Sequence, residues 1–495
     1  MGLNRRKLMS SGAALIAATA SAARAQPQSA PTTEKEIGPT ENGYSAASRG
    51  LQITNRFARF IAEMRFEDLT PEAVHEANRA VLDWLGCALA GSTHPTVKIL
   101  LQTFKNAGSA SVATVIGQGG LKFGLLDAAV ANGQMGHVLD FDDTHLGGVI
   151  LHTSTAVLPA LLALGEKRKS SGRDLIVALA AAFEAGIRTG QAAPRHHQGG
   201  WHLTGTLGTI AAGAGAARLL QLDAQKTVYA LGAACTQAAG MQQNRGTDCK
   251  SLHAGKSAYN GALAAMLASQ GFNSNEEILE GTLGFTKVYS RAEQKNELIT
   301  VGLGKNWMIT DNGYKPYACG VVQHPLIDAV IEVSRASQVP ASQVAQLEIK
   351  VHPDVIRITG VDNPGSDLMS KFSSNYAATV GYIDRAAGMK QFTKERGDDP
   401  AVQALRKLVK IQTDPTYRLD EAQATITTRT GEQHVKHIEH ATGTVANPMS
   451  DAALQEKFMG NATSVITEAR ARKIAAMSWK LDSLKDIGPL VRACG

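Results

Sequence analysis

The richest group of reactive side chains lies between two apolar segments, in the stretch His137-Val138-Leu139-Asp140-Phe141-Asp142-Asp143-Thr144-His145, followed by His152-Thr153-Ser154. Aspartates and histidines at such a junction are costly unless they are exposed or functional. Three interpretations are open. The stretch is a solvated acidic loop, a Mg²⁺ or Mn²⁺ site built from Asp142, Asp143 and His145, or a proton-transfer site with Asp140 and His152 as acid and base.

A second reactive group is the Gly-flanked run Arg195-His196-His197-Gln198-Gly199-Gly200-Trp201-His202, which precedes a Gly-rich helical segment at Thr204. The N-terminus of a helix offers free backbone N–H groups and a positive dipole end. His202 therefore lies where a substrate carboxylate is favourably bound.

Two further runs carry lysines. In Cys249-Lys250-Ser251-Leu252-His253-Ala254-Gly255-Lys256 the lysines are six residues apart, so they face different ways on one helix and only one should reach a given pocket. The run Lys315-Pro316-Tyr317-Ala318-Cys319-Gly320, with His324 following, suits carboxylate binding or a packed linker.

The elements that must position these residues are mostly helical. Thr70-Pro71-Glu72 has the N-cap hydroxyl, the first-turn proline and the acid that are typical of a helix start, and the apolar spacing that follows ends at Gly91. Glycines at 205, 208, 213 and 215 fit a helix only if its neighbours pack very closely. Further helices are predicted at 121–139, 154–169, 174–191, 204–220, 223–243 and 255–270.

The pattern changes after residue 312. Ala345 to Val351 alternates as a half-buried strand does, and residues 424–428 and 434–438 flank a hairpin turn at Thr430-Gly431-Glu432. Pro448-Met449-Ser450-Asp451 then caps a return to helix over 451–487. We expect a mainly α fold in which a large all-helical domain (46–312 and 446–495) is interrupted by a smaller α+β lid domain (313–445), with a cleft between them.

Composition excludes several classes. With 44% hydrophobic and 19% charged residues in 495, the chain is globular rather than disordered. The net charge of +6 includes four basic residues within the first 25 positions, which hold no acidic residue. The rest of the chain therefore carries a net charge of only +2. Such a charge does not indicate a surface that binds nucleic acid. Five scattered cysteines without a CxxC spacing argue against an iron–sulfur cluster or a structural zinc site.

The first 25 residues are typical of a twin-arginine signal peptide. Arg5-Arg6-Lys7 precedes a weakly hydrophobic, Ala-rich segment and the small-x-small cleavage pattern Ala23-Arg24-Ala25. A flexible linker rich in Pro, Ser, Thr and Glu is expected over 26–45. These features predict export to the periplasm, and no stable membrane association is expected.

Taken together, the chain resembles the MmgE/PrpD family, which includes 2-methylcitrate dehydratase, cis-aconitate decarboxylase and iminodisuccinate epimerase. The resemblance covers most of the chain and rests on the order and spacing of several short motifs. They are Gly136-His137-Val138-Leu139-Asp140-Phe141-Asp142-Asp143-Thr144, Gly200-Trp201-His202 with Thr204-Gly205-Thr206, Leu252-His253-Ala254-Gly255-Lys256, Lys315-Pro316-Tyr317, Phe372-Ser373 with Tyr376, and Pro448-Met449-Ser450-Asp451 with Lys457-Phe458.

The resemblance implies a homodimer and cofactor-free chemistry on small di- or tricarboxylic acids. The positions that match the family's active-site groups are Asp140, Thr144, His152, His202, Lys250, Lys315 and Tyr376. The chain departs from the family at Thr153 and Leu203, where proline is common, and at Gly320-Val321, in a stretch where some members carry another histidine.

We therefore expect a lyase or isomerase that abstracts a proton next to a carboxylate, with a 2-methylcitrate dehydratase-like hydro-lyase as the first choice. A decarboxylase, an epimerase and a non-catalytic periplasmic carboxylate-binding protein are the alternatives. Asp140, His152 and His202 are candidates for the proton transfers, and the lysines for holding carboxylates. The expected catalytic residues are Asp140, Thr144, His152, His202, Lys250 and Tyr376; those expected to bind substrate are Lys315, His253 and His324; no metal ligand and no cofactor is assigned.

Overall fold

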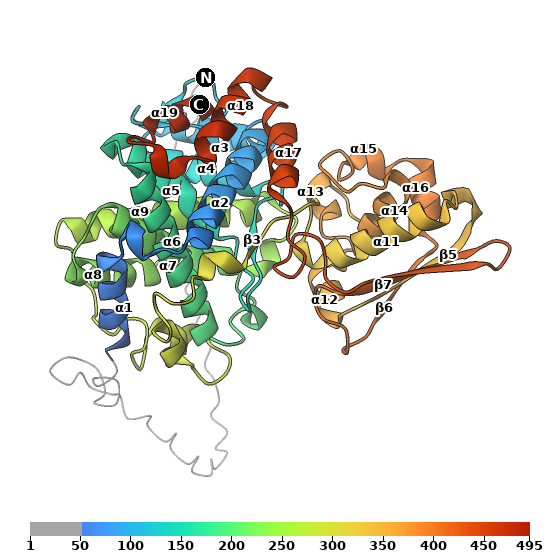
Figure 1. The fold of residues 1–495 in the computed structure, drawn as a ribbon, viewed down its shortest axis with the longest axis horizontal. Helices are drawn as coiled ribbons and strands as arrows, with labels where there is room; N and C mark the ends of the chain where they lie inside the picture. Colours follow the sequence, from blue (N-terminus) through green and yellow to red (C-terminus); the bar gives the residue numbers. More distant parts are fainter. Residues whose placement is uncertain (1–51) are drawn as a thin grey trace, which may run out of the picture. The chain divides into compact units, whose positions relative to one another are not determined.

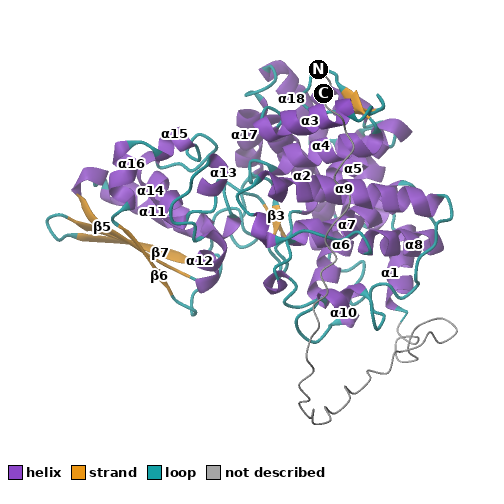
Figure 2. Ribbon diagram, turned by 180° about the vertical axis from the view of Figure 1, so that it is seen from behind, coloured by secondary structure: helices purple, strands orange, loops and turns teal. Residues whose placement is uncertain are grey.

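The structure is a computed structural model that describes residues 52–495, so the predicted signal peptide and linker lie outside the described residues. All described residues belong to one compact unit. The fold is mainly α, with only small sheets (Figures 1 and 2). No helix in this part of the chain is both long and apolar enough to cross a bilayer.

The first part of the described chain is helical. Its helices are α1 (Ile53–Glu63), α2 (Pro71–Gly91), α3 (Pro95–Asn106), α4 (Leu125–His137), α5 (Thr153–Arg168), α6 (Gly172–Ala192), α7 (Leu203–Leu219), α8 (Ala224–Cys235), α9 (Asp248–Ser269) and α10 (Phe285–Tyr289). Two short strand pairs connect them: β1 (Ala113–Thr114) with β2 (Lys122–Phe123), and β3 (Thr144–His145) with β4 (Asn312–Gly313).

The start of α2 follows the predicted chemistry, because the Thr70 side chain accepts from the Ala73 N–H and Pro71 occupies the first turn. The predicted close packing of the Gly-rich helix α7 is also confirmed. A Cβ built on Gly261 of α9 would lie only 2.5 Å from the Gly213 backbone nitrogen of α7. Glycine at both positions lets the two helix backbones approach, which brings the residues at the starts of α7 and α9 close together.

Three predicted helix boundaries are wrong. The segment 121–139 becomes helical only at Leu125, because Lys122–Phe123 pairs with β1. The helix predicted over 223–243 ends at Cys235. Helix α9 begins at Asp248 rather than near Gly255, since Gly246 turns the chain with a φ of 74° and Thr247 occupies the N-cap. Lys250 therefore lies inside the first turn of α9 and not ahead of it.

A second hydrophobic core lies around a four-stranded sheet with the strand order β6-β5-β7-β8. Strands β5 and β7 are antiparallel with Ile349 opposite Ala424, and β7 and β8 form the predicted hairpin. Strand β6, which the sequence analysis missed, runs parallel to β5. The strands are β5 (Val344–Val351), β6 (Val409–Thr413), β7 (Ala422–Thr428) and β8 (Gln433–Ile438).

Helices cover one face of this sheet. Alternate β5 and β7 residues, such as Leu347 and Ile426, are buried in the same cluster as Leu326 and Val330 of α11 (Figure 2). The helices of this region are α11 (His324–Ser337), α12 (Pro353–Thr359), α13 (Asp367–Ser370), α14 (Ser374–Asp384), α15 (Lys394–Gly397) and α16 (Pro400–Arg406). The domain boundaries at 312 and 446 stay predictions.

The chain then returns to helix and packs against α2. The predicted helix over 451–487 is interrupted and forms α17 (Asp451–Ala462), α18 (Glu468–Ser478) and, beyond it, α19 (Gly488–Cys494). Ser450 caps α17 by accepting from the Ala453 N–H. Lys457 of α17 forms a 2.7 Å ion pair with the buried Asp83 of α2.

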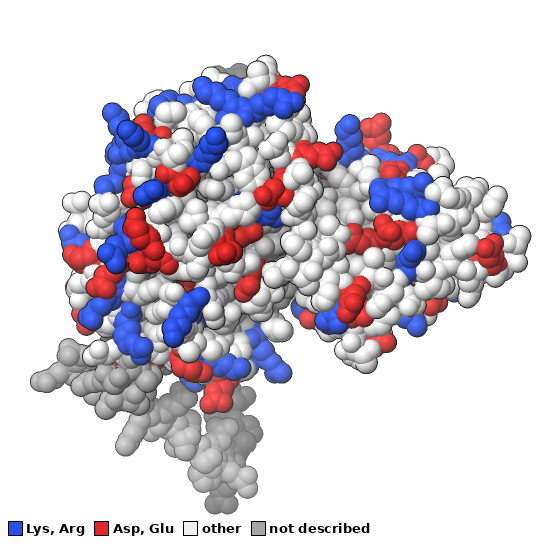
Figure 3. Space-filling model, in the orientation of Figure 1, with Lys and Arg blue, Asp and Glu red and all other residues white. Residues whose placement is uncertain are grey.

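Positive and negative side chains are interspersed over the face seen in Figure 3. No broad patch of one sign is visible on that face. This distribution agrees with the near-neutral body inferred from the sequence.

Candidate active site

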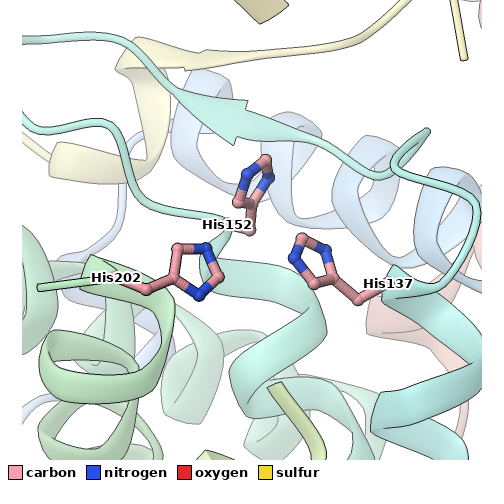
Figure 4. A group of neighbouring side chains, drawn as sticks. All are labelled: His137, His152 and His202. Carbon is pink, nitrogen blue, oxygen red and sulfur yellow. The ribbon is translucent and has the colours of Figure 1, made fainter. Parts of the chain in front are cut away.

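Three histidines from three different helix ends converge on one point. His137 is the last residue of α4, and His152 and His202 are the N-cap residues of α5 and α7. One ring nitrogen from each lies within 4.8 Å of the others, and the rings face a common centre (Figure 4). His137 and His152 are buried, while His202 is partly exposed. His137 belongs to the first reactive run of the sequence, but the sequence predicted no role for it.

Asp140 lies beside this centre and binds two lysines. Lys315 Nζ donates to Asp140 Oδ1 at 2.6 Å and to the Asp140 carbonyl at 3.1 Å. Lys250 Nζ lies 3.3 Å from Oδ2 of the same carboxylate. Burial alone would raise the pKa of Asp140, but the ammonium groups of Lys250 and Lys315 outweigh it and hold that pKa well below its usual range. Asp140 is therefore expected as a carboxylate near pH 7, with both oxygens paired to lysines.

The backbone explains how residues so far apart in sequence meet. Asp140 follows α4 with a φ of 50°, a left-handed conformation that bulky residues rarely adopt. Strand β3 pairs with β4, with Thr144 opposite Gly313, which brings Lys315 next to the 137–145 segment. The turn and the strand pairing together place the Lys315 ammonium on the Asp140 carboxylate.

Lys250 also belongs to a chain of hydrogen bonds. Its Nζ donates to His137 Nε2 at 3.0 Å, and His137 Nδ1 lies 2.8 Å from Asp142 Oδ2. Because Asp142 accepts, the proton of the neutral His137 ring is on Nδ1 and the Nε2 lone pair faces Lys250. Burial lowers the pKa of Lys250, although Asp140 opposes the effect. Lys250 is thus a more acidic ammonium than an exposed lysine.

His152 is suited to accept a proton, whereas Lys250 is suited to donate one. Its Nδ1 lies 3.0 Å from the Asp143 carbonyl oxygen, which accepts only, so Nδ1 carries the proton. Thr144 Oγ1 lies 3.0 Å from the same nitrogen. Burial, with the nearby lysines, holds the pKa of His152 well below its usual range. The ring is therefore neutral near pH 7, and its Nε2 lone pair is available as a base.

These groups share one small cavity of about 60 Å³. Lys250 and His202 both line it, although 48 residues separate them in the sequence. Lys256 is exposed elsewhere on α9. The residues lining the cavity are Asp140, Ile150, His152, His197, His202, Arg245, Lys250, Lys315, Gly320, Val321, Val322, Ile358 and Phe372.

Two family models match the chain over nearly all of its described length. The MmgE/PrpD N-terminal domain matches residues 55–298, and the MmgE/PrpD C-terminal domain matches residues 317–483. This chain belongs to the MmgE/PrpD family. The resemblance inferred from the motifs is thereby confirmed.

Among its MmgE/PrpD relatives are proteins named cis-aconitate decarboxylase. The Aspergillus terreus protein is 27% identical over 468 residues, which cover 89% of this chain and 95% of that protein. The Homo sapiens protein is 26% identical over 455 residues, covering 88% and 93%. A cis-aconitate decarboxylase-like protein oryM of Aspergillus oryzae is 28% identical over 468 residues, covering 89% and 96%.

Not every residue expected in this MmgE/PrpD site reaches the cavity. Thr144 and His253 do not line the cavity but contact histidines that do. Thr144 Oγ1 lies 3.0 Å from His152 Nδ1. His253 Nδ1 lies 3.0 Å from His202 Nδ1. Tyr376 is placed elsewhere: it is buried against Phe392, and its hydroxyl donates to a backbone carbonyl. Neither Tyr376 nor His324 lines this cavity, and their expected roles toward substrate stay predictions. His324 lines a neighbouring cavity of about 390 Å³ instead.

The metal-site interpretation of the 142–145 stretch does not fit either. Asp142 binds His137, whereas Asp143 accepts from Ser154 Oγ at 2.5 Å and from Asn312 Nδ2 at 2.6 Å. His145 Nδ1 faces the Val149 carbonyl. Each of these side chains is hydrogen-bonded to another part of the protein. Within residues 52–495 the three do not form a group with metal-ligand spacing. The solvated-loop interpretation is also wrong, since Asp140, Asp142 and Asp143 are all buried.

Gly320 lines the cavity at a closely packed point of the wall. A Cβ built on Gly320 would lie 3.0 Å from Thr359 Cγ2 and 3.3 Å from Gln323 Nε2. A larger side chain at this position would therefore require Thr359 or Gln323 to shift.

Proposed function

We propose that this protein is a cofactor-independent lyase that acts on a small di- or tricarboxylic acid by proton transfer at a carbon next to a carboxylate. The observation that carries the proposal is the cavity in which a neutral His152 faces the Asp140–Lys250–Lys315 cluster. Decarboxylation of cis-aconitate is the first reaction to test, since relatives across most of the chain bear that name.

The charges suit this reaction. When a C–C bond to a carboxylate breaks, CO₂ leaves and the bonding electron pair forms a new C=C bond. The electron pair of the old C=C bond then takes up one proton on carbon. The ammonium groups of Lys250 and Lys315 bind carboxylates of the anionic substrate and stabilise the charge that develops. Lys250, whose pKa burial lowers, is the proposed proton donor, and the His137–Asp142 pair orients it.

Water elimination from a citrate-type acid is the second candidate, and the neutral His152 favours it. In that reaction His152 Nε2 accepts the proton from the carbon next to a carboxylate, and Lys250 protonates the departing hydroxide. One C–H bond and one C–O bond break, and one C=C bond forms. This assignment makes His152 the base, and it makes Asp140 the anion that holds the two lysines in place.

The test is an assay of purified protein with cis-aconitate, methylcitrate, citrate and iminodisuccinate, in the presence of EDTA and in D₂O. We expect turnover that survives chelation. Decarboxylation should place one deuterium on the product carbon that gains the proton. For water elimination, His152→Ala should lower kcat by at least about 10²-fold, because a general base contributes about 10²–10⁴-fold. For decarboxylation, the corresponding loss is expected at Lys250, the proposed proton donor.

Two results would reject the proposal. Loss of activity on chelation would contradict the metal-free mechanism. Tight binding of a tricarboxylate without turnover of any compound would favour the non-catalytic carboxylate-binding protein instead.

We also propose a lid domain, a homodimer and a periplasmic location for this enzyme. The sheet region over 313–445 would act as a lid over the cavity, to which it contributes Lys315 and Phe372. The protein would act as a homodimer in the periplasm, as the family resemblance and the signal-like N-terminus indicate. Light scattering of the purified protein tests the dimer directly.

A further inference from the structure

The catalytic cavity holds more positive than negative charge. Its lining includes Arg245, Lys250 and Lys315, but Asp140 is the only acid among the residues that line it. Asp140 already lies within 3.3 Å of both lysines. The lining residues thus carry two more positive than negative charges. The buried Asp142 behind the wall is already bonded to His137, so the cavity favours a bound anion.

Arg245 is the cation that the proposed chemistry does not use. It lies between a short 3₁₀ turn (Gln242–Asn244) and the start of α9, so it comes from a different segment than Lys315. Its Nη2 donates to Gln242 Oε1 at 2.5 Å and lies 3.4 Å from His197 Nε2. Among the described residues, no carboxylate oxygen lies within ion-pairing distance of its guanidinium.

The neighbours hold this guanidinium in place without neutralising it. The Gln242 amide donates to the carbonyls of His197 (2.5 Å) and Trp201 (2.9 Å), which ties the Arg245 segment to the loop that leads to His202. Burial lowers the pKa of Arg245, the nearby Arg357 adds to the effect, and the more distant Asp140 carboxylate opposes it. An arginine stays charged in proteins despite such shifts, and its fork matches a carboxylate in a bidentate manner.

We propose that Arg245 binds the substrate carboxylate that is remote from the reacting carbon, while Lys250 and Lys315 bind the carboxylate next to it. The site thereby selects acids with at least two carboxylates at separate positions. Arg245 is a specificity-determining residue in this scheme, not a proton donor. The inference rests on the proposed function, because it assigns the binding mode within the same cavity.

The test compares two substrates in three variants. The substrates are the acid that the protein turns over and its monoamide, in which a carboxamide replaces the remote carboxylate. For the unmodified protein we expect kcat/KM to fall about 10–100-fold with the monoamide, as the loss of a charged hydrogen bond implies. In Arg245→Gln this discrimination should shrink to about 3-fold or less, and Arg245→Lys should retain part of it.

Arg357→Gln is the matched control. Arg357 lies close to Arg245 but is exposed, pairs with Asp354 at 2.6 Å and does not line the catalytic cavity. Its replacement should leave the discrimination intact. The inference is overturned if Arg245→Gln lowers kcat/KM equally for acid and monoamide, since that would mark a purely structural role. It is also overturned if Arg357→Gln abolishes the discrimination as fully.

A binding measurement separates this inference from the proposed function. Calorimetry with tricarballylate, a saturated tricarboxylate, and with its monoamide needs no turnover. If the protein has no lyase activity but Arg245 still controls the difference between these two ligands, the proposed function fails and the inference stands. If activity is present and the difference is independent of Arg245, only the inference fails.

Discussion

In the proposed mechanism, Asp140 organises the site without taking part in proton transfer. Its carboxylate has two lysine partners, and its pKa is held well below the usual range although burial opposes this. Both oxygens of Asp140 already have lysine partners, whereas the Nε2 lone pair of His152 is available to accept a proton because Nδ1 carries the ring proton. The sequence left the base open between Asp140 and a histidine, and the hydrogen bonds of His152 favour the histidine.

The first prediction concerns two lysines of α9. Lys250→Ala should lower kcat/KM by about 10²–10³-fold, since it removes a group that stabilises developing charge. The fold should be retained, because Lys315 still neutralises the buried Asp140. Lys256→Ala, on the exposed face of the same helix, should change kcat/KM little. Steady-state kinetics and thermal unfolding check both variants, and equal losses at the two positions would contradict the assigned site.

The second prediction concerns stability and pH at Asp143. Burial, with the nearby Asp83, raises the pKa of Asp143 from 3.8 to about 8. A raised pKa contributes stability that is complete below the unfolded-state pKa and is lost as the pH rises through the folded-state pKa. Asp143→Asn is neutral throughout, so its Tm minus that of the unmodified protein should increase between pH 5 and pH 8. Asp482→Asn, at an exposed position, should give a constant difference.

At the scale of elements, the contact between α4 and α9 sets the distance from His137 to Lys250. A Cβ on Gly133 would lie 2.5 Å from Gly255 Cα, and a Cβ on Gly255 would lie 2.3 Å from the Val130 carbonyl oxygen. The two helices thus touch through their backbones. Four residues along α4 from Gly133, His137 accepts from Lys250 of α9.

The third prediction follows from this contact. Gly255→Ala should force the helices apart, costing about 1–3 kcal/mol of unfolding free energy, as overpacking does. It should also lower kcat/KM, because Lys250 moves away from its partners. Gly460→Ala is the control: it lies in α17 with no atom near the added methyl group, and there alanine should stabilise by about 0.5–1 kcal/mol. Denaturant unfolding measures both, and a neutral Gly255→Ala would contradict the close contact.

At the scale of the whole molecule, the site exists because distant segments meet. His137 and His152 come from early helices, His202 and Lys250 from later ones, and Lys315 from the stretch after β4. The chain also returns through α17 to pack on α2. No single helix carries enough of the site to bind a multiply charged acid.

The fourth prediction concerns export of this whole unit. Replacing Arg5 and Arg6 together by lysine keeps the positive charge but removes the paired arginines that the twin-arginine pathway requires. The precursor should then stay in the cytoplasm. Fractionation of cells that express the two forms measures this. Continued export of the double variant would mean that the segment is read as an ordinary secretory signal.

The sequence alone determined the features that depend on local chemistry and on motif order. The N-cap at Thr70, the β7–β8 hairpin and the cap at Ser450 follow from short-range preferences, and each is present in the structure. The reactive runs were visible because polar groups between apolar helices carry a cost that needs a reason. The family could be inferred because its motifs occur in the same order and with similar spacing along this chain.

Only the tertiary structure decided which of these residues face one another. Contacts between segments far apart in sequence set the parallel pairing of β6 with β5, the placement of Tyr376 against Phe392 and the position of Arg245 at the cavity wall. Protonation states were decided in the same way. The pKa of Asp140 and the tautomer of His152 are set by burial and by hydrogen-bond and ion-pair partners that the fold supplies. Neither burial nor partners can be predicted from the neighbouring residues in the sequence.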